Sequence, residues 1–109
     1  MKLSNTPADR PHDDAVVDML RDDPEFADAY LSAALEEADQ PGGQAALLAA
    51  LRHVAEAQGM AAIAQRAGIP RESLYRALSP SGNPTIKTFL AVLGAAGLQL
   101  AVTRPEQHA

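Results

Sequence analysis

The fold is decided by residues 59–97, GMAAIAQRAGIPRESLYRALSPSGNPTIKTFLAVLGAAG. Apolar residues recur at helical spacing before Gly68, which predicts a short amphipathic helix over 60–67. Gly68 adopts a positive φ without a Cβ clash and so ends that helix. Pro70 suits the start of a second helix over 71–78. Its inner face is predicted to consist of Leu74, Ala77 and Leu78. Two short helices joined by a tight turn are typical of a helix-turn-helix, although a generic helical hairpin gives the same spacing.

A loop and a third helix follow this pair. The prolines and the glycine between residues 79 and 85 enforce the loop, and Thr85 is the expected N-cap of a helix over 86–96. The inner face of that helix is predicted to consist of Phe89, Leu90 and Leu93. Free N–H groups at a helix start favour an anion, so the loop and the first turn are candidate phosphate contacts.

Turning the apolar residues inward leaves the polar side chains of the 71–78 helix exposed. Arginine donates to guanine edges or phosphates, serine bonds either, glutamate accepts from the cytosine amino group, and tyrosine reaches a phosphate or stacks. We therefore predict DNA contacts at Arg71, Glu72, Ser73, Tyr75, Arg76, Asn83, Thr85 and Lys87. For Tyr75 a core position is the alternative, and for the loop residues ordinary turn and capping chemistry. The residue types leave open which arginine reads bases and which contacts phosphates.

The N-terminal half predicts three more helices, over 14–21, 25–38 and 44–58. The expected inward residues are Val16, Met19 and Leu20 in the first and Leu47, Leu48, Leu51, Val54 and Ala55 in the third. The 25–38 helix carries two apolar stripes, although a helix buried on one side needs one. The second stripe, which contains Phe26 and Tyr30, either widens the core or binds a partner.

Composition and charge bound the function classes. The chain of 109 residues has no cysteine, which excludes disulfides and thiol chemistry, and its 47% hydrophobic but 4% aromatic content favours packed helices. The net charge of −5 is divided unevenly, because residues 1–58 carry −8 and residues 59–109 carry +3. Such asymmetry suggests two surfaces for two partners, or an acidic half that only confers solubility. No apolar run or leader suggests a membrane, so we expect a cytoplasmic protein.

The chain end alternates apolar and polar residues over 98–103, which predicts a short β-strand. An unpaired strand must find another edge, so this one is expected to pair with its symmetry mate in a homodimer or with a partner's sheet, unless it lies on the core.

The predicted fold is all-α, a bundle of five to six helices with this C-terminal strand. We expect one domain over 14–103, flanked by tails over 1–13 and 104–109. The domain comprises acidic helices over 14–42, a helix-turn-helix core over 43–97 and the strand.

Two stretches are similar to a known family. The run RESLYRALSPSGNPTIKTFLAVLGAAGLQLAV (71–102) resembles the C-terminal half of the addiction-module antidote (antitoxin) family, and DPEFADAYLSAALEEAD (23–39) resembles its N-terminal part. The resemblance spans about residues 14–103 and implies a lambda-repressor-like helix-turn-helix. Relatives often have a polar residue in the first turn of the first motif helix, and residues 59–62 offer none.

The resemblance implies a type II antitoxin. Such a protein neutralises a small basic toxin of the RelE/ParE-like group, an mRNA-cleaving endonuclease encoded next door, and represses its own operon. The acidic side chains would complement a basic toxin, with Phe26 and Tyr30 as apolar anchors and Glu36 and Glu37 as charged contacts. The alternatives are a stand-alone helix-turn-helix regulator and an interaction module without DNA binding.

We expect no enzyme, cofactor or metal. The three histidines are scattered, and no nucleophile–base set or ligand-spaced cluster appears. His12 with Asp13 and Asp14 could touch a metal, although a solvated acidic patch is the simpler interpretation.

Overall fold

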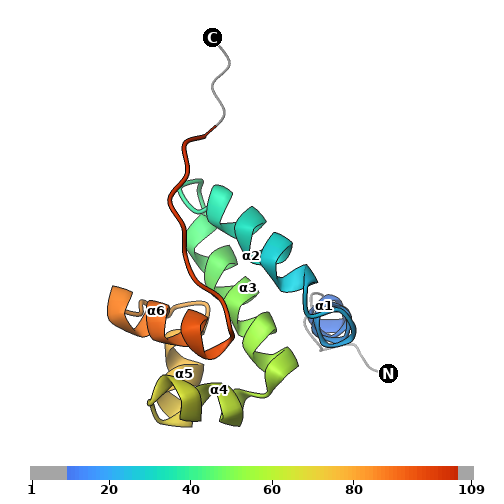
Figure 1. The fold of residues 1–109 in the computed structure, drawn as a ribbon, viewed down its shortest axis with the longest axis vertical. Helices are drawn as coiled ribbons and strands as arrows, with labels where there is room; N and C mark the ends of the chain where they lie inside the picture. Colours follow the sequence, from blue (N-terminus) through green and yellow to red (C-terminus); the bar gives the residue numbers. More distant parts are fainter. Residues whose placement is uncertain (1–9, 106–109) are drawn as a thin grey trace.

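The computed structural model describes residues 10–105, with side chains from residue 13 onward. All regular structure in this range is helical, which confirms the all-α prediction (Figure 1). The helices are α1 (Arg10–Asp22), α2 (Phe26–Glu36), α3 (Gly43–Gln58), α4 (Met60–Ala67), α5 (Arg71–Ala77) and α6 (Ile86–Ala95).

Helix α3 is the common support of the fold. It contacts α1 and α2 on one side and α4 on the other, and α4 in turn contacts α5 and α6. Figure 1 shows the two N-terminal helices separated by α3 from α4, α5 and α6. The acidic and basic parts of the sequence therefore occupy different sides of the molecule.

The helix bounds follow from local sequence. Helix α1 starts at Arg10, earlier than the predicted residue 14, since a proline such as Pro11 is tolerated in a first helical turn. The chain turns between α2 and α3 at Gly42, which has a φ of 77°, and between α3 and α4 at Gly59, which has a φ of 102°. L-residues with a Cβ rarely adopt such angles, so these glycines separate the helices. Residues 1–9, most of the predicted N-terminal tail, lie outside the described residues.

The core is aliphatic. Its most deeply buried side chains are Leu51, Val54, Ile63, Leu74, Leu78 and Val92. Two predicted inward residues are wrong, because Met19 is 50% exposed and Leu90 is 45% exposed. On α6 the buried face instead includes Val92 and Leu93, so Leu90 falls on its flank. Helical spacing identifies a stripe but not its centre, and the neighbouring helices decide which edge is covered.

The predicted strand over 98–103 is wrong for this single chain. Leu98 is anchored, because its N–H donates to the Leu93 carbonyl at 2.9 Å after Gly97 turns the chain with a φ of 84°. Beyond it, residues 99–105 are exposed and have no regular structure. A strand requires a ladder partner, and residues 10–105 provide none for this segment.

None of the helices in the described range has the length and apolar character needed to cross a membrane.

Candidate functional site

The α4–α5 pair is held by its turn. Gly68 has a φ of 74°, its N–H donates to Gln65 at 3.2 Å, and the N–H of Ile69 donates to Ala64 at 3.1 Å. Pro70 is extended, with a ψ of 146°, and its carbonyl accepts from Leu74 at 3.0 Å, which starts α5. The predicted bounds of both helices are confirmed to within one residue. Their assignment as a lambda-repressor-like helix-turn-helix stays a prediction.

Helix α5 buries one side and exposes the other. Leu74 and Leu78 are 0% and 1% exposed, so they fix the inner face. On the outer side the structure brings together the predicted residues Arg71, Glu72, Tyr75 and Arg76, all exposed, with Ser73 half-buried at the edge. Tyr75 is 42% exposed, which contradicts the alternative of a core position.

The exposed Tyr75 ring instead contacts the guanidinium of Arg71. The Arg71 guanidinium carbon lies 5.8 Å from the centroid of the Tyr75 ring, within the range of a cation–π contact. Positions i and i+4 are neighbours on a helix surface, which is why this pair meets without help from any other element.

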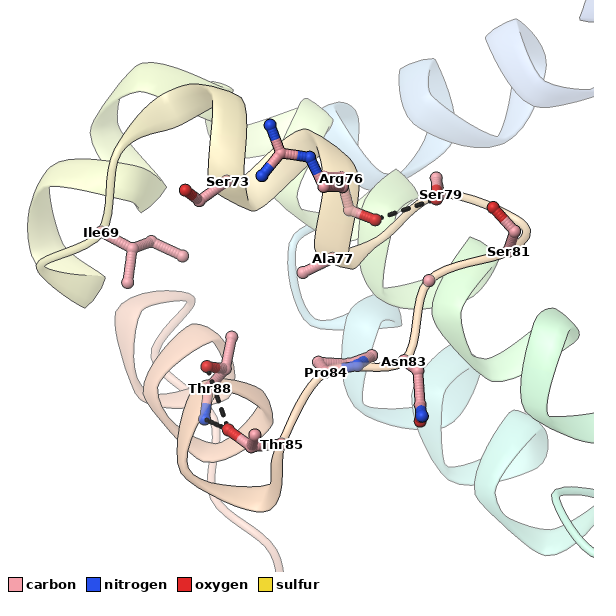
Figure 2. Close-up of a pocket in the computed structure, with 11 residues that line it drawn as sticks. Ile69, Ser73, Arg76, Ala77, Ser79, Ser81, Asn83, Pro84, Thr85 and Thr88 are labelled. Carbon is pink, nitrogen blue, oxygen red and sulfur yellow. Dashed lines mark hydrogen bonds between the residues drawn. The ribbon is translucent and has the colours of Figure 1, made fainter.

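A pocket of about 440 Å³ opens between α5 and the start of α6 (Figure 2). Thr85 caps α6, because its Oγ1 accepts from the Thr88 N–H at 3.1 Å. Most of the pocket surface is apolar, and its polar lining residues are Ser73, Arg76, Ser79, Ser81, Asn83, Thr85 and Thr88. The structure thus places the predicted Asn83 and Thr85 beside α5. Lys87 is exposed on the first turn of α6 but does not line this pocket.

Two other arginines have structural roles that the sequence analysis missed. Arg66 donates to the Ala95 carbonyl at 2.8 Å and caps the end of α6. Arg52 donates to the Leu78 carbonyl at 2.7 Å and holds the end of α5. Cations near helix C-termini are favourable, but both partners are distant in sequence, so no local pattern signals the contacts.

The acidic side carries the predicted partner-binding residues. Glu36 and Glu37 are exposed at the end of α2. Phe26 and Tyr30 are half-buried, pack against the core and lie with ring centroids 5.8 Å apart. The stripe that contains them therefore contributes to the core and presents only part of each ring to solvent.

A buried polar cluster joins α1, α2 and α3. His53 is 4% exposed, and its Nδ1 lies 2.6 Å from the Tyr30 hydroxyl. Asp13 Oδ1 lies 3.1 Å from His53 Nε2, but the two are not aligned as a hydrogen bond. The sequence analysis missed this cluster, because a histidine within an apolar helix gives no sign of its distant neighbours.

Acidification is expected to destabilise the protein through His53. Burial lowers the pKa of His53 below its ordinary value of 6.5, outweighing the carboxylates of Asp13 and Glu56, which raise it, while Arg52 lowers it further. The unfolded chain then binds the proton more tightly, so stability is fully present above pH 6.5 and falls as the pH drops below it. Urea unfolding at pH 7.5 and 5.5 measures this loss, which His53→Gln should reduce. An equal loss in both proteins would contradict it.

Within the described residues, no three His, Asp or Glu side chains cluster in a way that could hold a metal ion. The side chain of His12, named above with Asp13 and Asp14, lies outside the side chains described. Asp13 faces His53 instead.

Comparisons with known proteins agree with the earlier resemblance. Residues 12–104 match a family described as probable addiction module antidote protein. An uncharacterized protein of Haemophilus influenzae is 50% identical over 56 residues, which cover 51% of this chain and 58% of the relative. The chain thus spans little more than half of that relative's length. No solved structure matches the chain. Because the family match covers nearly all of the described residues, the chain belongs to the family of probable addiction module antidote proteins.

Proposed function

We propose that this chain is the antitoxin of a type II toxin–antitoxin module. It neutralises a small basic RelE/ParE-like mRNA-cleaving toxin by direct binding and represses its own operon through α5. The observation that carries the proposal is the separation of charge across α3 in a member of this family. One protein then offers an acidic surface to a cationic protein and a basic, hydroxyl-rich surface to DNA.

The DNA-binding part rests on the exposed side of α5. An α-helix fits the major groove, where the edges of the base pairs can be distinguished. Arg71 and Arg76 supply positive charge on α5, and Lys87 adds to it from α6. Ser73 and Ser81 in the adjoining pocket and the first turn of α6 would offer hydroxyl and N–H donors to the phosphate backbone.

A homodimer completes the DNA-binding unit. Few cations on one copy make the salt-dependent attraction to DNA weak, and a two-fold operator doubles the contacts. Beyond Leu98 the segment is exposed, with Leu100 and Val102 among its residues, and a second copy would pair with it there.

The toxin-binding part rests on the acidic side. Glu36 and Glu37 are exposed, which supports their proposed role as contacts for a cationic partner. The accessible parts of the Phe26 and Tyr30 rings serve as apolar anchors, although Tyr30 also bonds His53 internally. Charge mainly speeds encounter, whereas the buried apolar contacts provide most of the affinity.

Co-expression with any small basic protein encoded beside this chain tests the proposal. The partner alone should arrest growth, the pair should co-purify and restore it, and the complex should retard DNA from upstream of the chain's own gene. DNA retardation without a partner would identify a stand-alone regulator instead. Neutralisation without retardation would identify an interaction module, and the absence of both would overturn the proposal.

Neutralising two charges should slow toxin capture. Glu36→Gln combined with Glu37→Gln is expected to lower the association rate at low salt, with a smaller change in the dissociation rate. The effect should fade as added salt screens the surface charge. Stopped-flow mixing with the purified toxin measures both rates. The matched control, Glu36→Asp with Glu37→Asp, keeps the charge and should associate as fast as wild type. If the double glutamine variant also associated with the toxin as fast as wild type, Glu36 and Glu37 would not contribute to encounter.

A further inference from the structure

Helix α5 presents three parallel rows of side chains. At 3.6 residues per turn, Glu72 and Arg76 lie roughly 140° and 180° from the line that joins the buried Leu74 and Leu78. They form a central ridge. Arg71 and Tyr75 form a shoulder on one side of it, and Ser73 lies on the opposite side, where it lines the pocket.

We propose that this ridge reads the bases and that the two shoulders contact the phosphates. Arg76 would donate to a guanine and Glu72 would accept from a cytosine amino group, whereas Arg71 would bind the backbone. The inference rests on the proposed DNA binding and assigns the residues that determine its sequence specificity.

Arg71, the arginine on the shoulder, already has a partner on its own helix. Its guanidinium is stacked over the Tyr75 ring at 5.8 Å, on the flank of α5 nearer the core. A stacked guanidinium still presents N–H donors at its rim, and phosphate recognition uses such a rim. Tyr75 is therefore a positioning residue that holds Arg71 against its own helix.

Arg76, the arginine on the ridge, has no such partner among the described residues. Within residues 13–105 its guanidinium makes no hydrogen bond or ion pair, and the Ser79 hydroxyl donates to its main-chain carbonyl at 2.9 Å. Figure 2 shows the Arg76 guanidinium on the Ser73 side of α5 and away from Thr85 and Thr88. Arg76 therefore borders the pocket from the ridge, and its unpaired guanidinium can extend from there toward a groove floor.

The opposite shoulder supplies the second set of backbone contacts. Ser73 shares the pocket with the serines of the loop and with Thr85 and Thr88 of α6. Hydroxyl groups and the free N–H groups of the capped helix start suit a phosphate on the other strand that borders the groove.

Glu72 gives the ridge its chemical selectivity. An exposed carboxylate repels phosphates, and in the described part of the chain Glu72 has no cationic partner within ion-pair distance. Binding of DNA against the Glu72 carboxylate is favourable only where a base offers an amino donor. Cytosine has such an amino group, which a glutamate can accept from. The site on DNA should therefore contain cytosine opposite Glu72 and guanine opposite Arg76, at neighbouring base pairs.

Selection from a pool of random duplexes, followed by binding of the selected and scrambled duplexes in a salt series, tests the assignment. Arg76→Lys keeps the charge but loses bidentate geometry, so affinity for the selected duplex should fall roughly 5- to 150-fold while the scrambled duplex is unaffected. Arg71→Lys should preserve the ratio of the two affinities. Arg71→Ala should weaken both equally and reduce the salt slope by about 1. Arg21→Gln, a charge removed from α1, should leave the affinity ratio unchanged.

Variants of Glu72 and Tyr75 are expected to change DNA binding in different ways. Glu72→Gln should bind scrambled DNA more tightly and change its preferred base from cytosine to adenine, which pairs with glutamine. Glu25→Gln, remote from α5, should not change the base. Tyr75→Phe keeps the ring and should match wild type, whereas Tyr75→Leu should weaken both duplexes as Arg71→Ala does.

Two results would overturn the assignment while leaving the proposed DNA binding in place. One is loss of base preference in Arg71→Lys, whether or not Arg76→Lys loses it too. The other is a defect in Tyr75→Phe, which would show that the hydroxyl rather than the ring acts. If wild type selects no sequence and ignores its own upstream DNA, the proposed repression fails and this inference fails with it.

Discussion

Replacing Leu74 with alanine is expected to lower the free energy of unfolding by about 2–5 kcal/mol. The side chain is 0% exposed and anchors α5 to the core, so its removal leaves a cavity as well as losing apolar burial. That loss is a large share of the roughly 5–15 kcal/mol by which typical domains are stable. Urea unfolding at a fixed protein concentration measures it, since association would make the midpoint concentration-dependent.

The matched control is the same substitution at a leucine that the structure leaves half-exposed. Leu90→Ala on α6 should cost about 0.5 kcal/mol or less, because that side chain is 45% exposed. Equal losses in the two variants would contradict the burial described for α5. DNA affinity should also fall in Leu74→Ala, because α5 would no longer be held in one orientation.

Replacing Gly82 with alanine is expected to destabilise the protein by about 1–3 kcal/mol and to weaken DNA binding. A Cβ at this position would overlap the Ala77 carbonyl oxygen and lie 2.8 Å from the carbonyl oxygen of Arg76. The helix holds these main-chain atoms in place, so the loop that contains residue 82 must shift away from α5 to make room for the Cβ. That loop carries Asn83 and leads into Thr85, and both line the pocket beside α5.

Gly94→Ala provides the control for Gly82→Ala. Nothing lies within 4 Å of a Cβ built on Gly94, and the residue is within α6. Alanine there should stabilise the protein by about 0.5–1 kcal/mol, because glycine is the poorer helix former. Thermal unfolding and binding to the selected duplex compare the two variants. If Gly82→Ala behaves like Gly94→Ala, the close approach of the loop to α5 does not constrain the fold.

The helices could be predicted because their signals are local. Gly68 and Pro70 mark the turn between α4 and α5, and Thr85 marks the start of α6, where its hydroxyl caps the helix as expected. Each signal depends on the φ angle or hydrogen bond of a single residue, so the sequence is sufficient to place it. The exposed polar residues of α5 followed from the same helical spacing.

The cluster around His53 could not be predicted. Its three side chains come from positions 13, 30 and 53, and only the packing of α1 and α2 against α3 brings them together. The same holds for Arg66, which a count of charges assigns to a basic surface but which caps α6. The stacking of Arg71 on Tyr75 lies between these cases, because the spacing permits it but does not require it.

The amino-acid sequence by itself determined the helical class, the helix bounds to within a few residues, the opposite charges of the two halves and the polar side of α5. Hydrogen bonding, turn geometry and helical periodicity act over a few residues, so this information is carried locally. Tertiary structure alone decided that Met19 and Leu90 are exposed, that His53 is buried and that segment 98–103 has no strand partner within the described chain. Burial and pairing depend on which distant elements pack together, and that is a property of the whole fold.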